Sequence, residues 1–130
     1  MRQKIPDLEK AKSIIASAKK DYEYTLTIKV NDNSANTIIR NIYESFRMLG
    51  EALLIIKGFG FTDHMECINE LINLKIKTKR NIQILDYLRK TRHSINYYGY
   101  IAKKEEAEEI ISIGKDLFME FYNEVEKRLR

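Results

Sequence analysis

The chain has 130 residues and a mass of 15.4 kDa, a length that fits one domain, residues 1–130, and leaves no room for a second. Hydrophobic residues make up 44% and charged residues 32%, so the composition excludes a disordered or collagen-like chain. The net charge of +4 is mildly basic and by itself identifies no partner.

Cysteine content and hydropathy predict a cytoplasmic protein with no membrane association. The single cysteine, Cys67, excludes an internal disulfide framework and favours a reducing compartment. The N-terminal segment MRQKIPDLEKAK is amphipathic, so we expect no signal peptide. The longest apolar stretch, Met48–Ile56, contains Gly50 and Glu51 and is too short to cross a membrane.

One proline, Pro6, and five glycines predict long helices with few interruptions. A first helix after Pro6 is indicated by apolar residues at helical spacing, namely Leu8, Ala11, Ile14, Ile15, Ala18 and Tyr22. The stretch Tyr24–Val30 alternates like a strand. Because no other segment offers a partner strand, we favour a helix end there.

The polar cluster Asn31–Asn36 predicts a turn that precedes a long second helix ended by Gly58 and Gly60. The apolar face of this helix is expected to comprise Ile38, Ile39, Ile42, Phe46, Leu49, Leu53 and Ile56.

A third helix is expected to begin at Thr62 or Asp63, with Glu66 placed for a capping box. Its inward side chains are predicted to be Met65, Ile68, Leu71 and Ile72. A fourth helix spans about Asn81 to Tyr98 and ends at Gly99, and a fifth spans about Lys103 to Leu129. These elements predict an all-α fold, an antiparallel bundle of four to five helices.

Positive charge is concentrated before and within the fourth helix. The segment from residue 75 to residue 92 contains the basic residues Lys75, Lys77, Lys79, Arg80, Arg89, Lys90 and Arg92, against one acid, Asp86. We therefore expect a polyanion such as RNA to meet the chain here, with Lys79 and Arg80 as contacts. A solvated loop explains the basic residues from Lys75 to Arg80 equally well.

One face of the fourth helix carries a polar stripe. At helical periodicity, Ile84, Leu88, Ile95 and Tyr98 fall on the apolar face. The polar stripe comprises Arg89, Arg92, His93 and Asn96. Two guanidiniums, an imidazole and an amide on one stripe suit a phosphate, although a solvated helix face produces the same pattern.

The segment R-H-S-I-N-Y-Y-G-Y, from Arg92 to Tyr100, resembles the motif of the HEPN domains (higher eukaryote and prokaryote nucleotide-binding). That motif is an arginine followed by a polar residue and then, within two helical turns, a histidine, which a tyrosine often follows two positions later. Arg92 and His93 match its start, Tyr98 stands in place of the histidine, and Tyr100 matches the tyrosine. The stretch from Glu51 to Leu71, the chain length and the helix order are also similar to those of the family.

The resemblance implies a helical bundle that forms a homodimer with two motifs across a cleft. Many HEPN domains are metal-independent ribonucleases, and many are toxins paired with a small nucleotidyltransferase. Others are non-catalytic nucleotide-binding or partner-binding modules. In some pairs the partner nucleotidylates the motif tyrosine, which by position is Tyr100 here, with Tyr98 and Tyr97 as alternatives.

The replaced histidine leaves three functions open. RNA cleavage needs a cation and proton-transfer groups; Arg92 supplies the first, while a tyrosine, with a reference pKa near 10, is a poor base at neutral pH. An active ribonuclease would use Arg92 with His93 or Tyr98. The second reading is an RNA- or nucleotide-binding half of a toxin–antitoxin-type pair, with weakened or lost catalysis. The third is a non-catalytic helical adaptor.

The remaining motifs indicate neither a metal nor a cofactor. His64 and Cys67 are three residues apart, yet no second pair completes a metal site, so we interpret His64 as packed near the dimer cleft and Cys67 as a core residue. Tyr97, Tyr98 and Tyr100 either stack on bases or close an interface. No glycine-rich phosphate loop or nucleophile elbow occurs.

Overall fold

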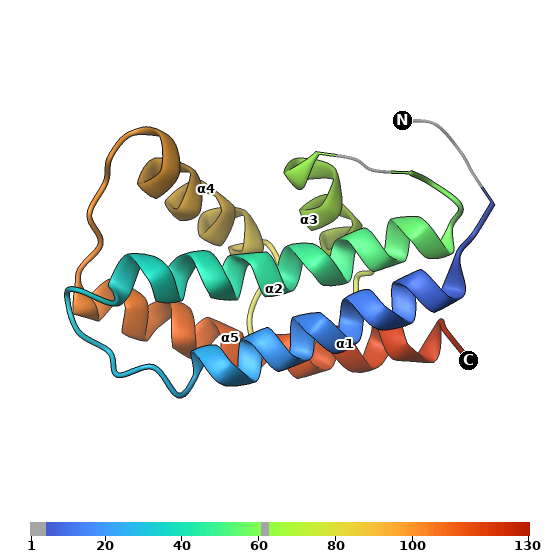
Figure 1. Ribbon diagram of the computed structural model, residues 1–130, viewed down its shortest axis with the longest axis horizontal. Helices are drawn as coiled ribbons and strands as arrows, with labels where there is room; N and C mark the ends of the chain where they lie inside the picture. Colours follow the sequence, from blue (N-terminus) through green and yellow to red (C-terminus); the bar gives the residue numbers. More distant parts are fainter. Residues whose placement is uncertain (1–4, 61–62) are drawn as a thin grey trace.

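The computed structural model describes residues 5–60 and 63–130, which form five helices (Figure 1). In chain order these are α1 (Leu8–Thr25), α2 (Ala35–Ile56), α3 (His64–Asn73), α4 (Ile84–Tyr97) and α5 (Lys104–Lys127). The expected all-α bundle is confirmed. None of the helices in the described ranges is long and apolar enough to span a bilayer.

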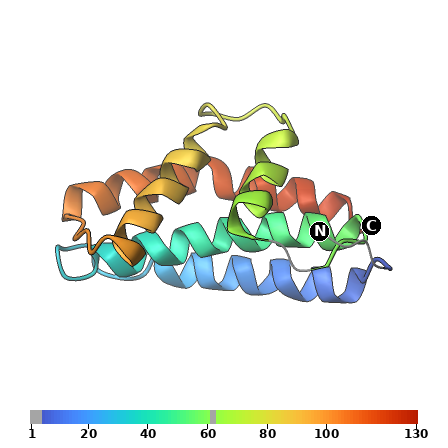
Figure 2. The ribbon, with the colours of Figure 1, turned by 90° about the horizontal axis from the view of Figure 1, so that it is seen from above.

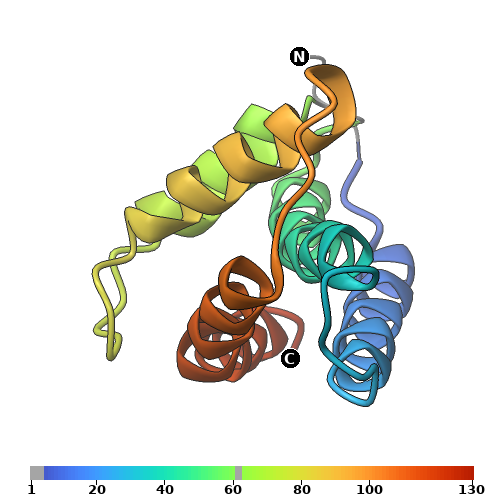
Figure 3. The same cartoon turned by 90° about the vertical axis from the view of Figure 1, so that its left-hand side faces the viewer.

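Helix α2 is the centre of the bundle and packs against each of the other four helices. Figure 1 shows that α1 runs antiparallel to α2 and α5, whereas α2 and α5 run in the same direction. The hairpin of α3 and α4 accounts for this direction, because it carries the chain back across one side of α2 (Figure 2). Seen end-on, α1, α2 and α5 are arranged as a triangle, and the hairpin of α3 and α4 lies outside it, next to α2 (Figure 3).

The core forms where the apolar faces of α1, α2 and α5 meet. Phe46 of α2 makes edge contacts with Phe118 and Phe121 of α5, at ring-centroid distances of 5.5 and 6.3 Å. Tyr22 of α1 stacks on Phe118 at 4.2 Å. The α2 residues predicted to face inward are buried from Ile38 to Leu53, as the helical spacing required.

Local sequence signals set the helix ends. The Asn31 side chain accepts hydrogen bonds from the backbone N–H groups of Asn33 and Ser34, so the polar cluster forms the turn expected before α2. Asp63 caps α3 by accepting from the backbone N–H of Glu66 at 2.8 Å. The alternative cap, Thr62, lies outside the described residues.

The same polar cluster also holds the distant start of α5. Asn36 accepts a hydrogen bond from the backbone N–H of Ala102, and Asp32 accepts one from that of Lys104, both at 2.8 Å. These bonds attach the α4–α5 connection to the beginning of α2. They therefore place the end of α4, and Tyr100 after it, relative to the central helix.

Gly50 allows α3 to lie directly on α2. A Cβ atom at Gly50 would lie 2.0 Å from the backbone carbonyl oxygen of Cys67, a separation that no two such atoms adopt. Because the obstructing atom belongs to the backbone, only a residue without a side chain permits this approach.

The helix end favoured for the stretch Tyr24–Val30 is confirmed, because α1 ends at Thr25 and residues 26–30 are irregular. The orientations of two side chains differ from the sequence-based expectations. Met65, expected to face inward, is 49% exposed because the short α3 buries only a narrow face, formed by Cys67, Ile68 and Leu71. Tyr98, expected on the apolar face of α4, is 76% exposed. Its backbone φ of −116° places it beyond the last helical turn, where helical periodicity no longer applies.

Candidate functional site

Arg92 of α4 lies against the central helix. Its guanidinium carbon is 5.3 Å from the centroid of the Tyr43 ring of α2, within the range of a cation–π contact. The side chain is only partly buried. Within residues 5–60 and 63–130, Arg92 forms no ion pair with a carboxylate, so its positive charge remains available to an anion.

Tyr43 is a neutral, buried platform beneath this guanidinium. The residue is 1% exposed, and burial raises the pKa of Tyr43 to about 12 despite the lowering effect of Arg92. Its hydroxyl oxygen has no hydrogen-bond partner among the described residues. A buried polar group left in this way is uncommon in folded proteins.

His64, the first residue of α3, contacts the same tyrosine. Its imidazole stacks on the Tyr43 ring at a centroid distance of 5.8 Å, and its Nδ1 atom is buried without a partner in the described structure. Burial lowers the pKa of His64, and the charges of Arg92 and Arg47 lower it further. Both effects favour the neutral form of His64, which lies beside the Arg92 cation.

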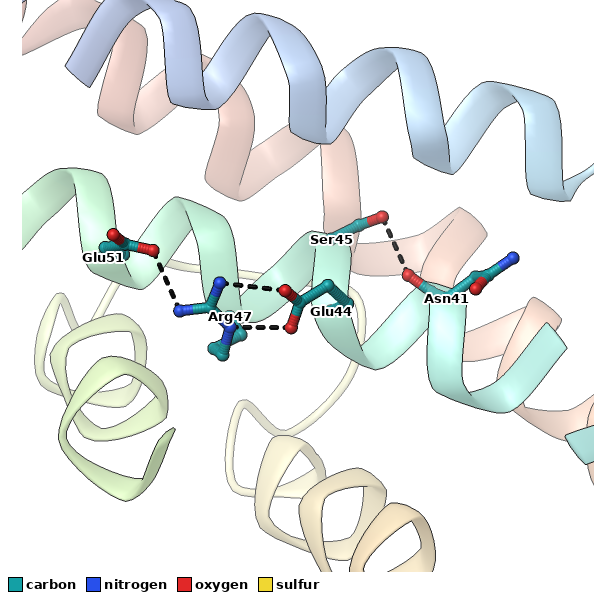
Figure 4. Close-up of polar contacts among 5 residues, drawn as sticks. All are labelled: Asn41, Glu44, Ser45, Arg47 and Glu51. Atoms are coloured by element: carbon teal, nitrogen blue, oxygen red, sulfur yellow. Dashed lines mark hydrogen bonds and ion pairs between the residues drawn. The ribbon is translucent and has the colours of Figure 1, made fainter. Parts of the chain in front are cut away.

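Arg47 differs from Arg92 in being neutralised. Its guanidinium donates to both carboxylate oxygens of Glu44, at 2.7 and 2.9 Å, and to Glu51 at 2.9 Å (Figure 4). These contacts raise the pKa of Arg47 above its ordinary value. Arg92 is consequently the arginine beside Tyr43 whose charge is not balanced by an adjacent carboxylate.

The other two candidate catalytic residues lie on the exposed side of α4. His93 is exposed, and its ring lies 4.7 Å from that of Tyr97 and 5.4 Å from that of Tyr98. Arg92 approaches the same group, with its guanidinium carbon 6.0 Å from the Tyr97 ring. Tyr97 thus connects Arg92 to His93 and Tyr98 at the end of α4.

The predicted binding residues divide into two places. Arg89 and Asn96 lie on α4 with Arg92, but each has a partner: Arg89 pairs with Asp86 at 3.0 Å, and Asn96 accepts from Arg40 at 2.6 Å. The expected contacts Lys79 and Arg80 precede α4. Lys79 is exposed, whereas Arg80 is bonded to α5, donating to Asp116 and Ser112, each at 2.7 Å.

Tyr100, the predicted modification site, follows α4. Its hydroxyl donates to the carboxylate of Glu106, with distances of 2.7 and 2.6 Å to the two oxygens, and this bond raises the pKa of Tyr100. Tyr100 is 42% exposed and borders a shallow pocket of about 270 Å³. The other lining residues are Tyr87, Lys90, Thr91, Ser94 and Glu106.

The sequence alone did not identify Tyr43 as part of this site, and it led us to interpret His64 as a residue packed near the dimer cleft. Tyr43 interrupts the isoleucine and phenylalanine face of α2 with a polar-tipped side chain, which is the one sequence signal that marks it. Within the described ranges, no group of three or more histidine, cysteine, aspartate or glutamate side chains is arranged to hold a metal ion.

Tyr43, His64 and Arg92 together combine a cation, a neutral imidazole and a phenol from three helices. Of these, Arg92 and His64 are partly exposed and can donate hydrogen bonds to an oxyanion, whereas the Tyr43 hydroxyl is buried. In comparisons with known proteins, no family model, no curated protein and no solved structure matched this chain.

Proposed function

We propose that the chain is a HEPN-like RNA- or nucleotide-binding domain that acts as one half of a pair with a nucleotidyltransferase, with weakened or lost catalysis. The observation that carries this proposal is the partly exposed Arg92 guanidinium, which rests on Tyr43 and has no carboxylate partner in the described structure. Its neighbour Arg89 is already paired with Asp86. An arginine held in this way favours a phosphate.

The exposed positions of His93 and Tyr98 support weakened catalysis. Tyr98 stands where the family motif has its histidine, and its side chain is 76% exposed. A phenol is a poor base at neutral pH.

Binding of a fluorescent single-stranded RNA at low salt tests the proposal. We expect Arg92→Ala to weaken binding about tenfold, as loss of one charge-assisted phosphate contact implies. Arg128→Ala is the matched control, because Arg128 is an exposed arginine of the α5 C-cap paired with Glu124. Equal affinities of wild type and both variants would contradict a binding role for Arg92 and favour the adaptor.

The pairing with a nucleotidyltransferase is tested through Tyr100. Its hydroxyl is partly exposed and bonded to Glu106, a carboxylate placed to accept a proton from a reacting phenol. After co-expression with a nucleotidyltransferase encoded beside this chain, we expect a nucleotide adduct in intact-mass spectra that disappears in Tyr100→Phe. Tyr24→Phe, at an exposed tyrosine of α1, is the control, and an unmodified wild-type protein would contradict this part of the proposal.

An active metal-independent ribonuclease is the second candidate, favoured by the contact of Tyr97 with both Arg92 and His93. Cleavage of a mixed RNA pool in EDTA distinguishes the two. Cleavage by wild type and Arg128→Ala but not by Arg92→Ala would establish the nuclease, and His93→Ala and Tyr98→Phe would then assign the proton-transfer groups. We expect no cleavage by any of these proteins.

The homodimer implied by the family resemblance remains part of the proposal. Tyr97, Tyr98 and Ile101, which lie at and just beyond the end of α4, are 64%, 76% and 74% exposed, and Tyr97 contacts Arg92. Sedimentation velocity is expected to give a dimer that Tyr98→Glu weakens.

A further inference from the structure

We infer that His64 is the second phosphate-binding residue of the Arg92 site, so that a phosphate group is held between the imidazole on α3 and the guanidinium on α4. The inference rests on the proposed function, since it specifies how the same site recognises a nucleotide or RNA phosphate. Neither His93 nor Tyr98 has this placement.

The geometry brings the two residues to one platform. Tyr43 lies 5.3 Å from the Arg92 guanidinium carbon and 5.8 Å from the His64 ring centroid. Because Tyr43 is 1% exposed on the central helix, packing fixes the ring that both side chains contact. The site therefore joins three consecutive helices, α2, α3 and α4.

Unpaired polar atoms mark the same place. The Tyr43 hydroxyl and His64 Nδ1 are both buried, and neither has a hydrogen-bond partner in the described structure. Two such atoms on adjacent rings are unusual, since buried polar groups are nearly always paired. Functional sites retain this kind of unsatisfied capacity for a ligand.

Among the charged groups around His64, Arg92 is the one that favours an anion. From α2 it faces Tyr43, Glu44 and Arg47, from α4 it faces Arg92, and Asp63 is adjacent in the chain. Arg47 is paired with both Glu44 and Glu51, so Arg92 is the cation facing His64 that has no carboxylate partner of its own in the described structure. A phosphate beside Arg92 would balance it and would accept a hydrogen bond from the His64 imidazole.

The response of His64 to phosphate can be compared with that of His93 in the same protein. The chain has two histidines, so an imidazole NMR spectrum contains two sets of resonances, which His93→Gln assigns. Titration with inorganic phosphate, against sodium chloride at equal ionic strength, reports directly on each ring. We expect phosphate to shift the His64 resonances and to raise the pKa of His64, because a nearby anion stabilises the protonated ring.

Affinity measurements on variants extend this test. We expect Arg92→Gln and His64→Gln each to weaken phosphate or AMP binding about tenfold and the control variant Arg128→Gln to leave it within about twofold. If Arg92→Gln weakens binding while the wild-type His64 resonances stay unmoved, the inference is wrong and the proposed function stands. If neither histidine responds and Arg92→Gln has no effect, both fail. The wild-type titration decides the matter even if His64→Gln does not fold.

Discussion

Arg92 of α4 and Tyr43 of α2 are in cation–π contact, with the guanidinium carbon 5.3 Å from the ring centroid. The contact links the hairpin of α3 and α4 to the central helix. It also keeps the guanidinium at the surface, beside a hydroxyl that has no partner in the described part of the chain. Both properties make the pair the centre of the candidate site.

Tyr43→Phe is expected to stabilise the protein by about 1 kcal/mol, because it removes a buried hydroxyl that makes no hydrogen bond and keeps the ring beneath Arg92. Urea denaturation measures the change. Tyr87→Phe, at an exposed position, is the control. A loss of stability would mean that the Tyr43 hydroxyl has a partner in the folded protein.

Gly50→Ala is expected to destabilise the fold by more than about 3 kcal/mol, since the new Cβ would collide with the Cys67 carbonyl and push α3 from α2. Gly99→Ala is the matched control. At Gly99, φ is +67° and no atom lies within 4 Å of an added Cβ, so only backbone strain of about 1–2 kcal/mol is expected. Equal costs would contradict the close packing at Gly50.

His64 is expected to make stability fall as the pH drops below about 6.5. Burial and Arg92 lower the pKa of His64 from its ordinary value of 6.5, so the unfolded chain binds more protons between the two pKa values. Acid therefore favours unfolding in this range, and the effect levels off below the folded-state pKa. The free energy of unfolding of wild type minus that of His64→Gln should decrease from about pH 7.5 to about pH 5. A constant difference would show that His64 titrates alike in both states.

Glu106→Gln is expected to lower the pKa of Tyr100, because the hydrogen bond to the Glu106 carboxylate is the main cause of its elevation. NMR of ring-labelled tyrosine, with Tyr100→Phe for assignment, measures the change. Glu105→Gln is the control, since Glu105 is an exposed neighbour in the first turn of α5. If the pKa of Tyr100 is the same in Glu106→Gln as in the wild type, the hydrogen bond between Tyr100 and Glu106 does not form in solution.

Lys79 and Arg80 are expected to respond differently to removal. Arg80→Ala should cost about 1 kcal/mol of stability, because its half-exposed side chain bonds Asp116 and Ser112. Lys79→Ala should leave stability unchanged and reduce the salt dependence of RNA binding by about one phosphate contact. Thermal denaturation and binding at several salt concentrations separate the two effects.

The amino-acid sequence by itself determined the five helices and most of the core. Apolar residues at helical spacing marked the buried face of α2, and Asp63 and Gly99 marked helix ends, because caps and periodicity depend on residues a few positions apart. The polar stripe of α4 followed from the same periodicity, which is why Arg92 was identified.

Only the tertiary structure decided which side chains join Arg92. Tyr43 and His64 belong to other helices, and their meeting depends on the approach of α3 to α2 at Gly50, which no local pattern encodes. Tyr98 is exposed because α4 ends before it, and Arg80 lies against α5 because it donates a hydrogen bond to Asp116. The placement of Tyr43, His64 and Arg80 rests on contacts between different helices, whereas periodicity reports only which face of a helix is apolar.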